Sequence, residues 1–139
     1  KEFQTLENEI SHIKDYIEIE KLRYDENLKV NFNINSKTKK VIVKPLILIP
    51  LVENAFKHGA RNSKKNGYIT IDLNATSNLL DFRIENSFEK PTKKIKAQIG
   101  GIGLTNLKKR LDLNYGPDFF NLDIIKEKNK YIAHLKIKL

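Results

Sequence analysis

The sequence predicts a mixed α/β domain with a mostly antiparallel sheet and helices on one face. Some segments repeat apolar residues at spacings of three and four, which indicates amphipathic helices, and others alternate apolar with polar residues, which indicates half-buried strands. In chain order the segments run helix, strand, helix, hairpin, loop, helix, hairpin. This order lacks the regular βαβ alternation of a Rossmann or P-loop domain.

The N-terminal part predicts one helix and one strand. The helix extends from residue 3 to residue 22 or 24, and the strand covers residues 28–34. Residues 35–37 indicate a turn. Residues 41–43 form a short extended segment, because the residue before Pro45 disfavours helix. The apolar stripe of the helix consists of Phe3, Leu6, Ile10, Ile13 and Ile17.

Two prolines shape the next helix. Pro45 suits the first turn of a helix, where an N–H group has no intrahelical partner. Pro50 is unfavourable inside a helix, so we expect a break or a restart there. The helix then continues to His58, and Gly59 can adopt the left-handed conformation that ends helices.

A hairpin and a long loop follow. Residues 68–73 and 79–85 alternate as two strands, with their turn at residues 74–78. Residues 87–99 show no periodicity and contain Pro91 with four lysines, which is typical of a lid or a binding loop.

The last part predicts a helix and a closing hairpin. The helix begins after Gly103 and ends near residues 115–117, where Tyr-Gly-Pro stops it. Strands over residues 119–125 and 131–139 complete the chain.

Composition limits the class of protein. The chain has 139 residues, enough for one domain with its own core, and no Cys, so neither disulfides nor thiol chemistry are available. No apolar run approaches the ~20 residues that a membrane-spanning helix needs. The chain lacks Met and begins at Lys1, so we expect a fragment of a longer protein.

The net charge of +9 comes from 26 Lys and Arg against 17 Asp and Glu. Most of the lysines are scattered, which favours a solvated surface. A basic nucleic-acid-binding domain is the alternative, although no aromatic residues are spaced for base stacking beside the lysines. The one dense cluster precedes a glycine segment, where it is placed to serve a phosphate, and consists of Lys90, Lys93, Lys94 and Lys96.

Residues 50–59 are the segment most informative about function. Asn54 and Lys57 share one helix face at spacing i, i+3. Asn supplies a neutral oxygen for a hard cation, and Lys supplies a point charge for phosphate. Each residue alone has an ordinary alternative role: a solvated amide for Asn54, or an ion pair of Lys57 with Glu53. His58 alone is typical of a cation at a helix C-terminus. Their combination favours a magnesium–nucleotide site.

A second phosphate-type pattern lies at residues 100–104, Gly-Gly-Ile-Gly-Leu. Gly101 and Gly103 end a basic loop and precede a helix, so their backbone N–H groups are available to phosphate oxygens. The pattern G-x-x-x-x-G-K-[ST] is absent, which excludes a Walker-type NTPase.

Three segments resemble sensor histidine kinases of the LytS type, members of the GHKL ATPase superfamily. Residues 44–59, KPLILIPLVENAFKHG, resemble the N box of that family. Residues 101–107, continuing to residues 110–116, resemble its glycine box and the helix after it. Residues 17–24 resemble the segment that precedes the ATP-binding domain. The resemblance covers nearly the whole chain.

This resemblance implies the GHKL (Bergerat) fold, a two-layer α/β sandwich that binds ATP between the N-box helix and a lid over residues 87–100. It implies that Asn54 coordinates Mg²⁺ and that Lys57 and Glu53 act in catalysis, with Glu53 polarising the attacking group. The nucleotide-binding residues that it implies are Asn54, Lys57, His58, Asn86, Gly101, Gly103 and Leu104.

Two positions depart from the family pattern. Asn86 stands where the family has the Asp of an Asp-x-Gly motif, and Phe88 replaces the glycine. Lys130 and Tyr131 stand where the last strand usually has Gly-Thr beside the adenine. These departures leave open a degenerate GHKL domain that acts as a protein-interaction module.

The resemblance also implies an arrangement and partners. Residues 1–26 would be a helix leading in from an upstream phosphoacceptor region, and residues 27–139 the ATP-binding catalytic domain. That domain would be cytoplasmic in a full-length protein of the cell membrane. It would transfer the γ-phosphoryl group of ATP to a histidine outside this chain. The partners implied are a response regulator, the upstream dimerisation segment and a second copy in a homodimer; no nucleic acid is expected.

Overall fold

The computed structural model describes residues 3–23, 28–36, 41–57, 67–88 and 102–139. A five-stranded sheet with the order β2-β4-β5-β7-β6 forms one layer. Its strands are β2 (Lys29–Ser36), β4 (Tyr68–Ala75), β5 (Leu79–Ser87), β6 (Phe120–Lys126) and β7 (Lys130–Lys138). Only the pair of β2 and β4 is parallel among these described strands, so the expected mostly antiparallel sheet is confirmed.

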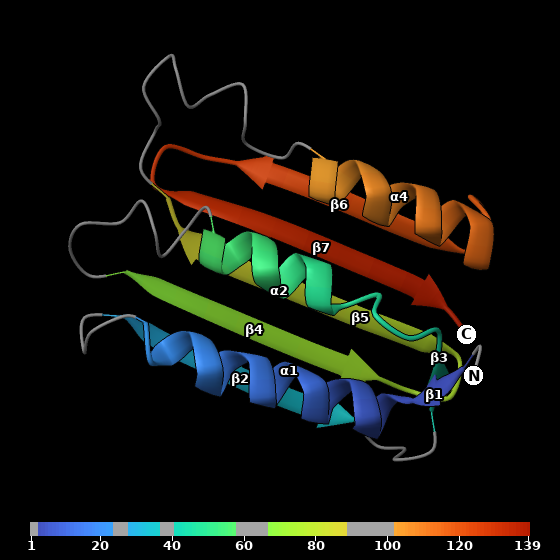
Figure 1. Cartoon of the computed structure of the whole chain (residues 1–139). Helices are drawn as coiled ribbons and strands as arrows, with labels where there is room; N and C mark the ends of the chain where they lie inside the picture. The colour runs from blue at the N-terminus through green and yellow to red at the C-terminus, as the bar shows by residue number, and fades with distance from the viewer. Residues whose placement is uncertain (1–2, 24–27, 37–40, 58–66, 89–101) are drawn as a thin grey trace.

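The three described helices form the second layer on one face of this sheet, as expected (Figure 1). They are α1 (Leu6–Lys21), α2 (Ile49–Ala55) and α4 (Ile102–Asn114). A two-stranded ladder of β1 (Gln4–Thr5) and β3 (Ile42–Val43) lies at the start of α1. None of the helices in the described ranges combines the length and the hydropathy needed to cross a lipid bilayer.

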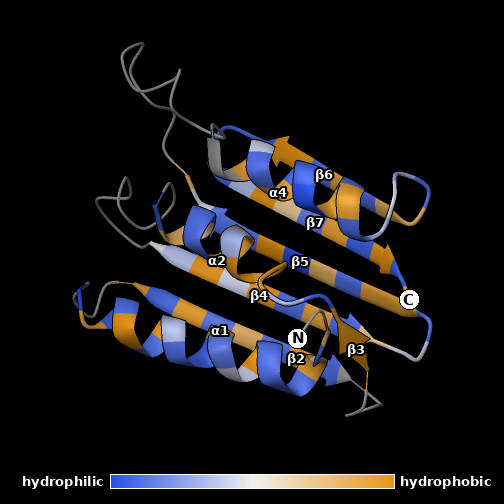
Figure 2. Ribbon diagram, turned by 45° about the vertical axis from the view of Figure 1, so that its right-hand side comes forward, coloured by the Kyte–Doolittle hydropathy of each residue, from blue (hydrophilic) through white to orange (hydrophobic). Residues whose placement is uncertain are grey.

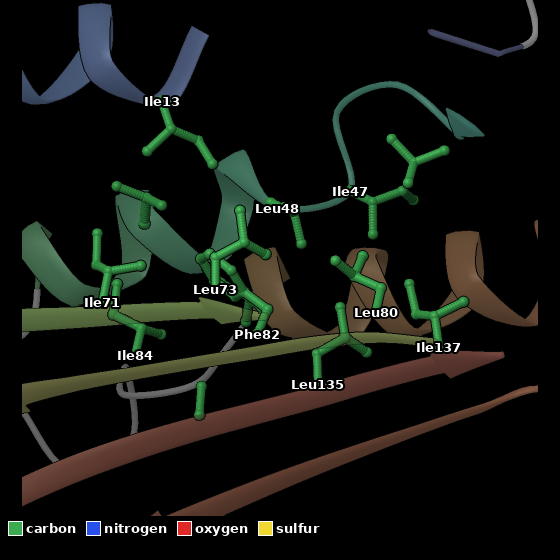
Figure 3. Close-up of a cluster of buried hydrophobic side chains, with 14 of the residues drawn as sticks. Ile13, Ile47, Leu48, Ile71, Leu73, Leu80, Phe82, Ile84, Leu135 and Ile137 are labelled. Carbon is green, nitrogen blue, oxygen red and sulfur yellow. The ribbon is translucent and has the colours of Figure 1, made fainter. Parts of the chain in front are cut away.

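The core lies between the two layers. Hydrophobic and hydrophilic residues alternate along the strands (Figure 2), because successive side chains point to opposite faces. Figure 3 shows Ile13 of α1 above Ile71 and Leu73 of β4, with Phe82 of β5 and Leu135 of β7 in the same cluster. All five side chains are buried. The common core thus includes the lead-in helix, and a domain boundary near residue 26 stays a prediction.

The structure corrects some of the expected boundaries. Residues 35 and 36 belong to β2 and not to a turn, because β2 pairs with β4 as far as Ser36. Pro45 lies in a turn before α2, and Pro50 occupies the first turn of the helix instead. The restart expected at Pro50 is therefore confirmed, whereas the helical start at Pro45 is wrong. The Gly59 cap and the lid beyond Phe88 lie outside the described residues.

Candidate functional site

The turn over residues 45–48 sets the orientation of α2, and a buried carboxylate stabilises that turn. Glu9 of α1 is 0% exposed. Its Oε2 accepts hydrogen bonds from the backbone N–H groups of Ile47 and Leu48 at 3.0 and 3.1 Å. Its Oε1 accepts from the backbone N–H of Leu46 at 3.3 Å and from the side chain of Gln4. A carboxylate buried among N–H donors satisfies backbone groups that would otherwise be unpaired.

The other side of the same turn is held by α4. Leu46 has a φ of 59°, a left-handed conformation that a branched side chain rarely adopts. Arg110 donates from Nη1 to the Leu46 carbonyl at 2.7 Å. The Tyr115 hydroxyl accepts from the Lys44 backbone N–H at 2.8 Å. Contacts from α1 and α4 thus compensate for the strain of the turn and set the position of α2.

Sequence reasoning missed Glu9, although its spacing contained a clue. Glu9 follows Leu6 by three residues and precedes Ile13 by four, so it lies on the apolar stripe of α1. A charged residue at such a position needs buried partners. Arg110 and Tyr115 had no comparable clue, because their contacts come from sequence-distant backbone.

The side of α2 that faces away from the core presents Glu53, Asn54 and Lys57, which the sequence predicted as site residues. Leu51, Val52 and Ala55 are fully buried against the sheet. Asn54 is half-buried between this apolar face and solvent, while Glu53 and Lys57 are exposed. The helix therefore places one amide at the edge of the core and two charged groups in solvent. His58 lies outside the described residues.

The amide of Asn54 lies beside the hydroxyl of Tyr131 on β7. Tyr131 is 1% exposed, and its hydroxyl has no hydrogen-bond partner within the described ranges. Burial raises the pKa of this hydroxyl, and the nearby Asn54 side chain acts in the opposite direction as a donor.

The end of β5 completes the floor of the site. Asn86 is 1% exposed and lies opposite Tyr131 in the β5–β7 register. Its Nδ2 donates to the Ser87 carbonyl at 2.8 Å. Phe88 packs on Tyr131 with ring centroids 5.9 Å apart. Both positions that depart from the family pattern therefore fold into one buried cluster.

The start of α4 lies next to this cluster. Leu104 is half-buried and packs against both Phe88 and Tyr131. A cavity of about 310 Å³ opens beside it between α4 and the β6–β7 strands. Gly103 belongs to α4, whereas Gly101 lies outside the described residues. The phosphate role of the glycine segment stays a prediction.

The donor set of the site fits a magnesium ion bound mainly through phosphate. Among the described residues no three acidic, histidine or cysteine side chains cluster as metal ligands. Mg²⁺ commonly takes one or two protein oxygens and completes its shell with water and phosphate oxygens. Asn54 is an oxygen donor at the edge of the core that can serve as such a ligand.

Comparison with known sequences finds sensor kinases. The chain is 32% identical to the sensor histidine kinase BtsS of Escherichia coli over 120 residues, which are 85% of this chain and 21% of that protein. It is 27% identical to the sensor protein LytS of Staphylococcus epidermidis over 122 residues, which are 81% of this chain and 21% of that protein. The chain thus spans about a fifth of the length of these relatives. No family model matches it.

Comparison with solved structures finds the same fold. The catalytic domain of histidine kinase ThkA superimposes with a TM-score of 0.64 at 20% identity, covering 98% of this chain and 94% of that chain. The crystal structure of ThkA in complex with the response regulator protein TrrA gives a TM-score of 0.61 at 18% identity, covering 98% of this chain and 41% of that chain. The α/β fold class expected from the sequence is confirmed.

Proposed function

This chain is a relative of the LytS and BtsS sensor histidine kinases with the fold of histidine kinase catalytic domains, and we propose that it is the ATP-binding catalytic domain of a two-component sensor kinase. The observation that carries the proposal is the placement of Asn54. Its amide lies half-buried on a helix that α1 and α4 hold in position, beside a buried hydroxyl. This arrangement supports a ligand role and not a freely solvated amide.

The proposed roles divide between neutralising charge and positioning. Asn54 would hold Mg²⁺ through its side-chain oxygen, and the ion would supply positive charge to the phosphate oxygens of ATP. Lys57, exposed one turn further along, contacts the phosphates as a point charge. The implied phosphate contacts of His58, Gly101 and Gly103 belong to the same proposal. Catalysis of this kind depends on positioning and electrostatic stabilisation.

The proposed reaction transfers the γ-phosphoryl group to a histidine of a partner segment. A ring nitrogen of that histidine forms a bond to the γ-phosphorus, and the bond from phosphorus to the bridging oxygen breaks. ADP leaves with the electron pair, and the other nitrogen of the ring, which carries the imidazole proton, releases it. Glu53 polarises the attacking imidazole from its exposed position beside Asn54.

Recognition of the base is assigned to the end of β5 and the start of α4. Asn86 already uses its Nδ2 on the Ser87 carbonyl, so its Oδ1 is the atom left to accept from the amino group of adenine. Leu104 supplies an apolar contact next to that position. The proposed partners are the upstream phosphoacceptor segment, a second copy of the protein, and a response regulator. The proposed location is the cytoplasmic side of a membrane-bound sensor.

A titration of the chain with ATP and Mg²⁺ tests this proposal. A ligand at a hundred times its dissociation constant stabilises a protein by about 2.7 kcal/mol. A chain of 139 residues has an unfolding entropy of about 0.3 kcal/mol per K, so the expected rise in Tm is about 9 °C. Asn54→Ala should abolish the magnesium-dependent part of this rise. Asn8→Ala, an exposed amide on α1, is the matched control and should keep it.

The same titration distinguishes the kinase proposal from the alternative of a protein-interaction module. That alternative is favoured by the buried cluster of Phe88 and Tyr131, which stands where the family pattern has Gly and Gly-Thr. A wild-type chain whose Tm does not respond to ATP with or without Mg²⁺ would support the interaction module and reject the kinase proposal.

A further inference from the structure

The helix layer covers the β6 edge of the sheet incompletely. α4 lies over β6 and β7 (Figure 1), and β6 is the last strand in the sheet order. Leu122 and Ile124 of β6 pack against the core from the helix side, yet both are only half-buried. Leu135, which lies directly opposite Leu122 on β7, is 0% exposed. The apolar surface of β6 therefore continues beyond the part that α4 shields from water.

A cavity of about 310 Å³ occupies this incompletely covered region. Its volume lies at the lower end of the range for small-molecule sites, roughly 300–1,000 Å³. Leu122 and Ile124 line the cavity from β6, and Leu104 of α4 and Tyr131 of β7 also line it. An apolar group that fills the cavity would remove this surface from water, which is favourable.

Two positive charges and no negative charge belong to the described lining of the cavity. Lys108 of α4 and Lys126 of β6 both line it. Both side chains are exposed, and neither forms a salt bridge with another described residue. Because two like charges beside one cavity repel each other, a negative group bound next to both is favoured. Apolar walls with basic side chains are complementary to a molecule that has an apolar body and an anionic head.

We propose that this cavity binds a small amphipathic anion, an aryl or short acyl compound with a carboxylate or phosphate head. Its apolar body lies against β6, and its head lies beside Lys108 and Lys126. The site is separate from the proposed nucleotide site, because none of its lining residues belongs to α2, although it borders that site at Leu104. A cavity of this volume encloses a small molecule, whereas a stable protein interface needs about 800 Å² on each partner.

The test titrates the ¹⁵N-labelled, nucleotide-free chain with naphthoate and follows the amide chemical shifts. We expect saturable shifts around Lys108 and along β6 and none on α2, with a dissociation constant of roughly 0.1–1 mM for a ligand of this size. Naphthamide has the same rings without the charge and should bind more weakly. A parallel titration with naphthyl phosphate decides between the two heads, because the tighter ligand identifies the preferred one.

Substitutions at the two lysines test the role of charge. Lys108→Gln and Lys126→Gln keep exposed polar side chains, so the fold should persist. Each should weaken naphthoate binding about threefold and both together about tenfold, the size of one and two partly exposed ion pairs. The matched control combines Lys109→Gln with Lys128→Gln, which removes the same charge from exposed positions that do not line the cavity. The control should bind naphthoate like wild type.

Several outcomes would overturn the proposal. Shifts that do not saturate at millimolar naphthoate would show that the cavity is no binding site. Equal affinity for naphthamide, or an equal loss in the control variant, would leave only apolar contact or overall charge as the cause. Displacement of naphthoate by ATP would make the cavity part of the nucleotide site. Tighter binding of an acidic peptide with one aromatic residue, through the same lysines, would assign the cavity to a protein partner instead. A chain that binds naphthoate but no nucleotide would reject the kinase proposal and leave this one standing.

Discussion

Replacing Glu9 with Gln tests whether the buried carboxylate holds the turn that leads into α2. Gln has the same size, so the packing of α1 stays intact. Its carbonyl oxygen can take the place of Oε2 and keep the bonds from Ile47 and Leu48, now at 3.0 and 3.1 Å. Its NH₂ group then replaces Oε1 and meets the Leu46 N–H, so a donor faces a donor. Gln4 can rotate its amide and accept from the new NH₂ group.

The expected loss of stability follows from these contacts. Bonds to a charged acceptor contribute about 1.5–3 kcal/mol each, against about 0.5–1.5 kcal/mol for neutral pairs. Two weakened bonds and one lost bond, partly offset by not burying a charge, give a net loss of about 2 kcal/mol. Glu9→Ala leaves the buried Ile47 and Leu48 N–H groups unpaired and should cost about 4 kcal/mol.

Thermal and urea unfolding measure these losses. At about 0.3 kcal/mol per K, Glu9→Gln should lower the Tm by about 7 °C. Glu18→Gln, the same substitution at an exposed position of α1, should change stability by no more than about 0.5 kcal/mol. Equal effects of the two substitutions would refute the reasoning, because the carboxylate of Glu9 would then contribute nothing beyond its size.

Two further predictions concern the rest of the fold. Burial works to raise the pKa of Glu85, but hydrogen bonds from Tyr68 and Arg83 outweigh it and hold the pKa below 4.5. Because the folded-state pKa of Glu85 is lowered, its carboxylate contributes stability that is present above about pH 4.5 and is lost as the pH falls through the folded-state pKa. Glu85→Gln should therefore be less stable than wild type at neutral pH. Urea unfolding should show the unfolding free energies of the variant and the wild type converging in acid. Gly116→Ala should lower the stability of the fold by about 1–2 kcal/mol, because a φ of 88° is strained for any residue with a Cβ. The added Cβ would lie 3.7 Å from Phe119, which is an ordinary contact, so the loss comes from the backbone and not from a clash. An unchanged urea midpoint would contradict this.

The sequence by itself determined most of the helices and strands and which residue types α2 presents toward solvent. Periodicity located α1, the β4–β5 hairpin and the closing strands, because side-chain direction repeats locally every 3.6 or 2 residues. The Asn54 and Lys57 spacing placed both side chains toward the solvent edge of α2 for the same reason. Boundaries that depended on pairing were less accurate: β2 extends through Ser36 because β4 offers it partners.

Only the tertiary structure decided what surrounds Asn54. The parallel pairing of β2 with β4, the contact of Glu9 with the residue 46–48 backbone, and the bond from Arg110 to Leu46 all join residues far apart in the chain. No local pattern encodes such contacts, because they depend on how two layers pack. The buried hydroxyl of Tyr131 arises in the same way, where the start of β7 packs against Phe88 at the end of β5.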